Sequence, residues 1–180
     1  MTLSLAIPDI LVARAKSGDL DALEALYRAF ETPVYNLALR ILRSPEDAED
    51  VLQETFLEVV RSIGQYRGEG HLWGWIRRIA ASKALMRIRR DQVRATEEFD
   101  ETAAGHVGPV GAVPARIDLE RAFDRLSETS RAVVWLHDVE GHTHEEIAEL
   151  MGKTVSFSKS QLARAHARLR GMLDQEGAAS

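Results

Sequence analysis

Apolar residues recur every three or four positions along nearly the whole chain of 180 residues. This spacing places them on one face of an α-helix, whereas a strand exposed on one side alternates apolar and polar residues. The stripes run from Ile10 and Leu11 near the start to Leu162 and Leu169 near the end. No segment shows a convincing alternation of the strand type. The sequence therefore predicts an all-α fold.

Polar and glycine residues predict where these helices begin and end. We expect a first break at Ser17-Gly18-Asp19 and a new helix that opens at Pro33 with Thr32 as its N-cap. Ser44 and Pro45 have the order of a cap followed by proline in the first helical position, so another helix begins there. After a break over residues 64–70, a long helix is expected from His71 to about Arg94.

Residues 96–114 differ in character from the rest of the chain. The stretch from Ala95 to Pro114 contains three glycines, two prolines and four acids, but no base. A segment of this length and composition is typical of a linker. We therefore predict two small helical domains, 9–95 and 115–175, joined by an acidic linker at 96–114.

The second predicted domain contains a helix-turn-helix pattern. One helix follows the cap Ser127 and stops at Gly141, and Thr143 caps the next, with Glu146 in the capping-box position three residues later. Gly152 ends that short helix, and Thr154 caps a last long one. A helix, a short glycine turn and a second helix form the layout of a DNA-binding motif.

Charge supports this interpretation of the second domain. Five bases and no acid lie between Lys153 and Arg170. Arg and Lys side chains suit guanine edges and phosphates in a major groove, and Gln suits adenine. The candidate DNA-binding residues are Ser156, Phe157, Lys159, Ser160, Gln161, Arg164 and Arg168 on the last helix, with His144 and Arg131 as candidates for phosphate contacts.

The first predicted domain divides its charges between two helices. Residues 44–58 carry six acids and no base, whereas residues 71–94 carry seven bases and one acid. The acidic helix suits a basic protein partner. The basic helix suits phosphates, and an exposed aromatic beside it would suit stacking on unpaired bases. Trp75 is expected in the core, and Trp73 is left open between core and surface.

Composition excludes several other classes of protein. The chain has no cysteine, so a disulfide scaffold, a thiolate metal site and a cysteine nucleophile are excluded. The N-terminus lacks the positive region of a signal peptide, and no long apolar run predicts a membrane span, so we expect a cytoplasmic protein. His137, Asp138, His142 and His144 lack the common face that a metal needs, and no metal or other cofactor is expected.

The second domain resembles the −35-reading domain of bacterial sigma factors of the extracytoplasmic-function (ECF) type. The resemblance rests on the segment from Glu140 to Gly152 and on Val155, Lys159-Ser160, Leu162, Arg164-Ala165 and Leu169. Lys153 and Ser158 stand where the family usually has an apolar residue. Gln161 stands where Arg is common, which is expected to alter base preference.

The first domain resembles the same family. Its segment Asp47-Ala48-Glu49-Asp50-Val51-Leu52-Gln53-Glu54-Thr55-Phe56 is similar to the helix that docks on the clamp coiled coil of the polymerase β′ subunit. The resemblance implies core-polymerase contacts by Asp47, Asp50, Val51, Gln53, Glu54, Phe56 and Leu57. Its basic helix is similar to the −10 helix, which implies DNA contacts by Trp73, Arg77, Arg78, Lys83, Arg87, Arg89 and Arg90. Ser82 and Met86 depart from the common Asn and Asp there.

The resemblance implies a promoter-specificity subunit rather than an enzyme. Its implied partners are core RNA polymerase, through the β′ clamp coiled coil and the β flap, promoter DNA and an anti-sigma factor. Two other hypotheses stay open from the residues alone. One is a stand-alone helix-turn-helix regulator with an N-terminal sensor or dimerisation domain. The other is a helical hydrolase built on the carboxylates of residues 46–58.

The formal net charge of −5 argues at first against a nucleic-acid-binding protein. It is, however, an average over segments of opposite sign. Residues 44–58 contribute −6, whereas residues 71–94 contribute 7 − 1 = +6 and residues 153–170 contribute +5. The acidic total is therefore compatible with two basic DNA-binding helices and one acidic protein-binding helix.

Overall fold

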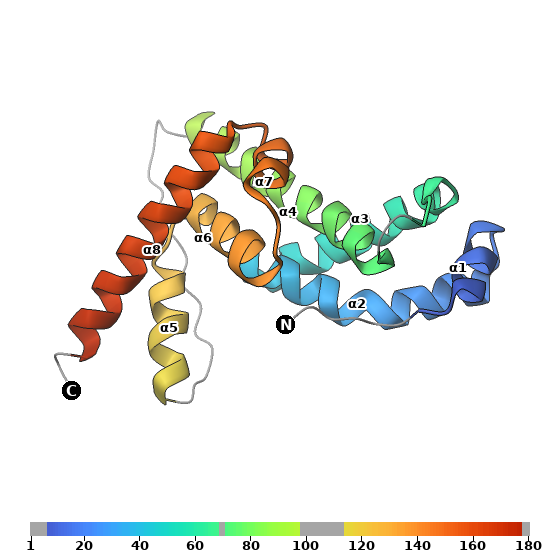
Figure 1. The fold of residues 1–180 in the computed structure, drawn as a ribbon, viewed down its shortest axis with the longest axis horizontal. Helices are drawn as coiled ribbons and strands as arrows, with labels where there is room; N and C mark the ends of the chain where they lie inside the picture. The colour runs from blue at the N-terminus through green and yellow to red at the C-terminus, as the bar shows by residue number, and fades with distance from the viewer. Residues whose placement is uncertain (1–6, 69–70, 98–113, 178–180) are drawn as a thin grey trace. The chain divides into compact units, whose positions relative to one another are not determined.

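The computed structural model describes residues 7–68, 71–97 and 114–177 (Figure 1). Every regular element among these residues is a helix, which confirms the predicted fold class. Most of the predicted linker, residues 98–113, lies outside the described residues. None of the helices in the described ranges has both the length and the apolar composition for crossing a membrane.

The chain divides into two compact units, residues 1–86 and 87–180. The first unit contains α1 (Asp9–Lys16), α2 (Leu20–Leu42), α3 (Pro45–Ser62), the 3₁₀ turn η1 (Ile63–Gln65) and the start of α4 (Leu72–Glu97). The second contains the end of α4, α5 (Pro114–Asp124), α6 (Glu128–Val134), η2 (Trp135–Val139), α7 (His144–Met151) and α8 (Val155–Gly177).

Helix α2 is one continuous helix of 23 residues. The prediction that a separate helix opens at Pro33 with Thr32 as its cap is therefore wrong. A proline inside a helix removes one backbone hydrogen bond and costs about 3 kcal/mol. Leu26 and Phe30 before the proline and Val34 and Leu37 after it are all buried along one stripe, so packing on both sides of Pro33 offsets that cost.

The first unit is built around the antiparallel pair α2 and α3, which lie side by side in Figure 1. The turn between them has the predicted cap, because the Ser44 hydroxyl accepts a hydrogen bond from the Asp47 amide at 3.2 Å. Val51 and Val59 of α3 pack into the core with Ile76 of α4. The acidic helix of the sequence is thereby held with one side buried and the other toward solvent.

In the second unit, the structure confirms the predicted helix boundaries around the turn. Thr143 and Glu146 form a complete capping box at the start of α7, and the Thr154 hydroxyl caps α8. Gly141 and Gly152 both have positive φ, at 73° and 61°. Helix α8 packs on α5, α6 and α7 through the buried stripe Leu162, Ala165 and Leu169.

Between α6 and Gly141 the helix widens into a π-turn, η2, in which the Glu140 amide donates to the Trp135 carbonyl at 3.0 Å. A π-turn holds an extra residue and changes the direction in which the following side chains point. The apolar pattern of the sequence does not distinguish this turn from an ordinary helix. It carries His137 and Asp138, which take part in the site described below.

Candidate functional site

The solvent-exposed side of α3 forms a single stripe. Its members recur at spacings of three and four residues, and we call this set the α3 face: Glu46, Glu49, Gln53, Leu57 and Val60. The stripe is acidic at its start and apolar at its end, where Leu57 is 56% exposed and Val60 is also exposed. It therefore offers a partner both negative charge and apolar area.

Two of the predicted polymerase contacts, Val51 and Phe56, lie in the core of the first unit. Val51 is buried, and Phe56 is only 8% exposed, with its ring 4.8 Å from that of Tyr27 in an edge-to-face arrangement. Both side chains hold α3 onto the core of the unit and are not available to a partner. Gln53 and Leu57 lie on the α3 face, and Asp47, Asp50 and Glu54 are half-buried beside it. Glu46, Glu49 and Val60 were not among the predicted contacts, but they are exposed and share the helical register of Gln53 and Leu57.

Helix α4 presents a second stripe, which we call the α4 face: Arg78, Ser82, Met86 and Arg89. Arg78, Met86 and Arg89 are exposed, and so is Arg90 next to the stripe. Arg78 and Arg89 are about 16 Å apart along a helix. Ser82 and Met86 lie between these bases, so the two residues that depart from the family pattern are on the same side as the candidate DNA contacts.

Trp73, one of the predicted DNA-binding residues, lies inside the first unit. It is 6% exposed and its ring stacks on that of Phe30 with centroids 5.7 Å apart, so it is a core residue. Trp75 is half-buried against Tyr66, with 5.4 Å between ring centroids. Among the bases, Arg77, Lys83 and Arg87 are half-buried, and the Lys83 ammonium lies 3.9 Å from the Glu58 carboxylate.

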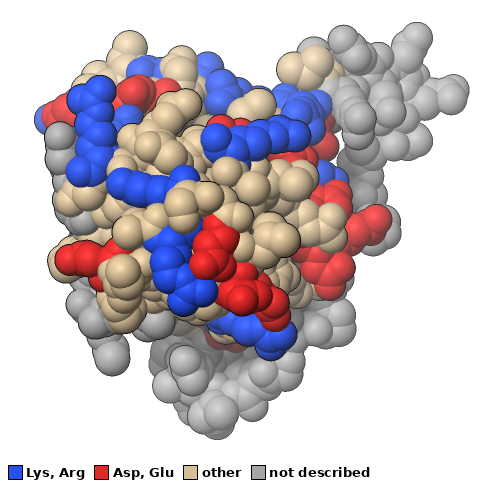
Figure 2. Space-filling view, turned by 90° about the vertical axis from the view of Figure 1, so that its right-hand side faces the viewer, with Lys and Arg blue, Asp and Glu red and all other residues tan. Residues whose placement is uncertain are grey.

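Charged side chains of both signs are mixed on the face of the molecule shown in Figure 2. The described residues of the first unit include two close ion pairs. Arg14 lies 2.7 Å from Asp19, and Arg28 lies 2.6 Å from Glu24. Such exposed pairs contribute little to stability. They do neutralise part of the basic charge of this unit, outside the α4 face.

Helix α8 presents the third stripe, which we call the α8 face: Ser156, Lys159, Ser160, Arg164 and Arg168. All five side chains are exposed, as the sequence predicts. Phe157 is half-buried, with the Lys153 ammonium 5.8 Å from its ring centre. The face begins directly after the turn of the helix-turn-helix motif and carries three positive charges.

Two other predicted DNA contacts have roles inside the second unit. Arg131 is buried and donates to the Leu126 carbonyl at 3.5 Å, so its guanidinium is engaged within the protein, and the phosphate contact stays a prediction. Gln161 is half-buried, and its amide oxygen lies 3.4 Å from the Ser130 hydroxyl that donates to it. The periodicity of the sequence gives no sign of either contact, because one joins α6 to the turn that precedes it and the other joins α6 to α8.

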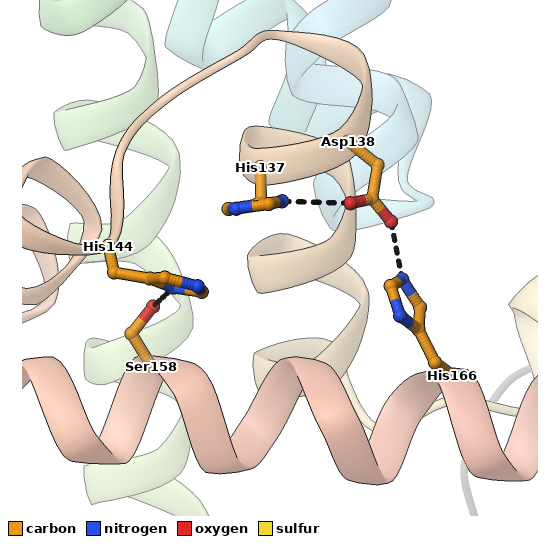
Figure 3. Close-up of polar contacts among 5 residues, drawn as sticks. All are labelled: His137, Asp138, His144, Ser158 and His166. Atoms are coloured by element: carbon orange, nitrogen blue, oxygen red, sulfur yellow. Dashed lines mark hydrogen bonds and ion pairs between the residues drawn. The ribbon is translucent and has the colours of Figure 1, made fainter.

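Behind the α8 face, polar side chains of η2, α7 and α8 form a connected group (Figure 3). The Asp138 carboxylate lies 2.8 Å from Nδ1 of His137 and 2.6 Å from Nε2 of His166. The His137 ring stacks on that of His144 at 4.5 Å, and Nδ1 of His144 lies 3.0 Å from the Ser158 hydroxyl. His144, predicted to touch phosphate, is thus engaged within the protein.

The surroundings change the acidity of two members of this group. Partial burial alone would raise the pKa of the Asp138 carboxyl, but hydrogen bonds from His137 and His166 outweigh that effect and hold its pKa below the ordinary value. Loss of water, with the nearby charges of His137 and Lys159, lowers the pKa of His144. Within the described ranges, no three side chains of the metal-ligating types converge on one point.

Taken together, a capped helix-turn-helix and an exposed basic second helix define the second unit as a DNA-binding module. Two family models match the chain: Sigma-70 region 2 over residues 26–94 and Sigma-70, region 4 over residues 116–169. The first match contains the α3 and α4 faces. The second contains the helix-turn-helix.

Relatives similar over most of the chain come from several bacteria. The ECF RNA polymerase sigma factor SigM of Mycobacterium tuberculosis is 31% identical over 167 residues, which cover 91% of this chain and 83% of that protein. The RNA polymerase sigma factor CarQ of Myxococcus xanthus is 32% identical over 169 residues, or 90% of this chain and 95% of that protein. The chain belongs to the ECF RNA polymerase sigma factors, which direct core polymerase to promoters and start transcription there.

Solved structures share the fold. The sigma factor RpoE of Bartonella quintana, solved with the anti-sigma factor NepR, matches with a TM-score of 0.59 at 20% identity and covers 84% of this chain and 96% of its own. CnrH, solved with the cytosolic domain of CnrY, matches with a TM-score of 0.56 at 24% identity, over 92% of this chain and 96% of its own.

Proposed function

We propose that this sigma factor divides its work among the three exposed faces. The α3 face binds the β′ clamp coiled coil of core polymerase, the α4 face binds the −10 element and its melted strand, and the α8 face reads the −35 duplex while the second unit contacts the β flap. The chain itself catalyses no reaction, and it acts in the cytoplasm.

The exposure of the α8 face is the single observation that carries this proposal. Three bases, Lys159, Arg164 and Arg168, lie in register with Ser156 and Ser160 on the solvent side of the second helix of the motif. Arg and Lys on such a helix can reach phosphates and guanine edges in the major groove. The acidic and apolar α3 face supplies a different chemistry, which suits a protein surface.

A stand-alone helix-turn-helix regulator has no need of the α3 face. Run-off transcription with purified core polymerase distinguishes the two functions, since only a sigma factor makes initiation depend on the chain. Transcripts that start at a selected promoter only when the chain is added would support the proposal. The regulator would be favoured if the chain binds a specific duplex without core polymerase and transcription does not rise when the chain is added.

We also propose that an anti-sigma factor regulates this chain. The support is the similarity to RpoE and CnrH, whose structures hold NepR and part of CnrY. Co-purification of the tagged chain from its own cells, followed by run-off transcription with and without the captured protein, would test this. A captured protein that leaves transcription unchanged would contradict it.

The domain limits 9–95 and 115–175 are also a proposal, and the composition of the linker offers a test. Residues 95–114 hold four acids and no base. A glutamate-specific protease should therefore cut at Glu97, Glu98 or Glu101 before it cuts elsewhere, and leave two stable fragments. Early cleavage at the exposed acids of α3 instead would argue against these limits.

A further inference from the structure

Two hydrogen bonds tie α8 to the rest of the second unit, one from the fully buried Ser158 on the side opposite the α8 face and one from His166, which lies at the edge of that face and whose side chain is 41% exposed. One joins Ser158 to His144 at the start of α7, and the other joins His166 to Asp138 in the π-turn (Figure 3). The two α8 positions are eight residues apart, which is about 12 Å along a helix. The apolar stripe of α8 lies between and beside them.

The chemistry of the Asp138 contacts fixes the protons on its neighbours. An ionised carboxylate can only accept hydrogen bonds. His137 must therefore carry its proton on Nδ1, and His166 must carry one on Nε2, because these nitrogens face the carboxylate oxygens. Asp138 is thus bonded to one histidine of its own turn and to one of α8.

Hydrogen bonds restrain the position of α8 more tightly than apolar packing alone does. Small side chains such as Ala165 let a helix slide or rotate slightly at little cost, whereas a hydrogen bond weakens steeply with distance and angle. Two such bonds, about two turns apart, oppose both rotation and sliding of α8. Asp138 is negatively charged, so a DNA phosphate would repel it. The role that the structure supports for Asp138 is therefore the contact to His166 and not a contact to DNA.

On this geometry, and resting on the −35 role proposed above, we propose that Asp138, His166, His144 and Ser158 are positioning residues for promoter recognition. They fix the rotation of α8 about its own axis and its position along that axis, so that its exposed face fits the −35 groove. They act through α8 and do not touch bases. The sequence analysis considered the neighbouring histidines for a metal site and His144 for a phosphate contact, and it did not connect them with His166, which is far from them in sequence.

The test compares full-length variants bound to core polymerase. His166→Leu removes the donor to Asp138, His166→Gln keeps an amide donor at a similar reach, and Ser158→Ala removes the second contact. His71→Leu is the matched control, because His71 is an exposed histidine of the first unit. The probe is a fluorescein-labelled promoter duplex recovered by selection with the wild-type holoenzyme, beside the same duplex with its −35 element scrambled.

We expect His166→Leu and Ser158→Ala each to lose about tenfold in preference for the intact −35 element, the size typical of one strong hydrogen bond. Circular dichroism should show both still folded at the assay temperature. His166→Gln should recover most of the preference, and His71→Leu should match the wild type. If the contacts only stabilise the fold, binding to the intact duplex and to the scrambled duplex should fall together.

The remaining outcomes separate failure of the positioning role from failure of the proposed −35 role. If the wild type prefers the intact element and the two variants do so equally, the positioning role is overturned and the proposed function stands. If the wild type shows no preference, the proposed −35 role fails and the positioning role fails with it. Should a variant not fold, the ¹⁵N imidazole spectrum of the wild-type chain decides, because a bare Nε2 on His166 or a bare Nδ1 on His137 would overturn the proposed contacts.

Discussion

At the residue scale, neighbours in sequence have opposite roles on α3. Phe56 is buried against Tyr27, whereas Leu57 is among the most exposed large apolar side chains of the described residues. One step along a helix turns a side chain by about 100°, so the segment that resembles a docking surface contains both core and surface residues. Only substitutions of the surface residues can test docking without disturbing the core.

This distinction yields a test of core-polymerase docking. Leu57→Asp should weaken binding to core polymerase by about tenfold, as expected when an apolar anchor is lost, while urea unfolding of the chain is unchanged. Ile10→Asp is the matched control, because Ile10 is an exposed apolar residue on α1. Phe56→Ala should instead destabilise the first unit by about 3 kcal/mol through the cavity it leaves. Equal losses of binding for Leu57→Asp and Ile10→Asp would exclude a specific α3 contact.

His144 predicts how the stability of the second unit depends on pH. Its pKa in the folded chain lies below the ordinary value of 6.5, so the unfolded chain binds a proton more readily. The folded chain therefore favours the neutral His144 ring. The stability that this preference contributes is fully present above pH 6.5 and is lost as pH falls through the folded pKa. Besides His137 and Lys159, the charges of Glu145 and Asp138 act on the ring, and these two oppose the shift.

Urea unfolding from about pH 7.5 to about pH 5.5, on either side of the ordinary histidine value, checks this dependence. The wild type should lose more stability on acidification than His144→Asn, which cannot take up the proton. Parallel curves for the two proteins would contradict the prediction. His137→Asn serves as a second comparison, because it removes the ring stacked on His144.

At the element scale, the turns of the second unit depend on glycine geometry. Gly141 ends the π-turn with φ of 73°, in the left-handed region that other residues adopt at a cost. Gly141→Ala should therefore destabilise this unit by about 1–2 kcal/mol. Gly171→Ala is the matched control, because Gly171 lies inside α8 with open space around it, and should stabilise by about 0.5–1 kcal/mol. Equal shifts in the urea midpoint for both would contradict this account.

At the scale of the whole molecule, segregation of charge explains how an acidic chain binds DNA. The net charge of −5 includes an acidic α3 and an α8 with basic residues in its exposed stripe. Each phosphate contact releases counterions, so binding falls steeply as salt rises. The α8 face is the part of the second unit from which this dependence is expected.

The slope of holoenzyme binding against salt measures these contacts. The double variant Lys159→Gln, Arg164→Gln should make the slope shallower by about 2 units if both bases neutralise phosphates. Arg28→Gln is the control, because Arg28 is paired with Glu24 in the first unit. An unchanged slope in the double variant would place the phosphate contacts elsewhere on the protein.

Short-range patterns in the sequence predict the all-α class, most helix ends and the helix-turn-helix. These features depend on neighbours within about four residues, such as the Thr143–Glu146 box and the left-handed Gly152. Local signals failed at Pro33, where packing across α2 offsets the cost of the proline. The sequence pattern also predicted that the α8 face is exposed, because bases at helical spacing rarely enter a core.

Which aromatic, acidic and basic side chains are exposed depends on how the helices pack. Trp73 and Phe56 lie in the core and Arg131 is buried, although sequence patterns suited all three to binding. Contacts between segments far apart in sequence, such as Asp138 with His166, also appeared only in the fold. The physical reason is that burial and directional hydrogen bonds depend on which helices pack together. Residue spacing along one helix carries no information on that.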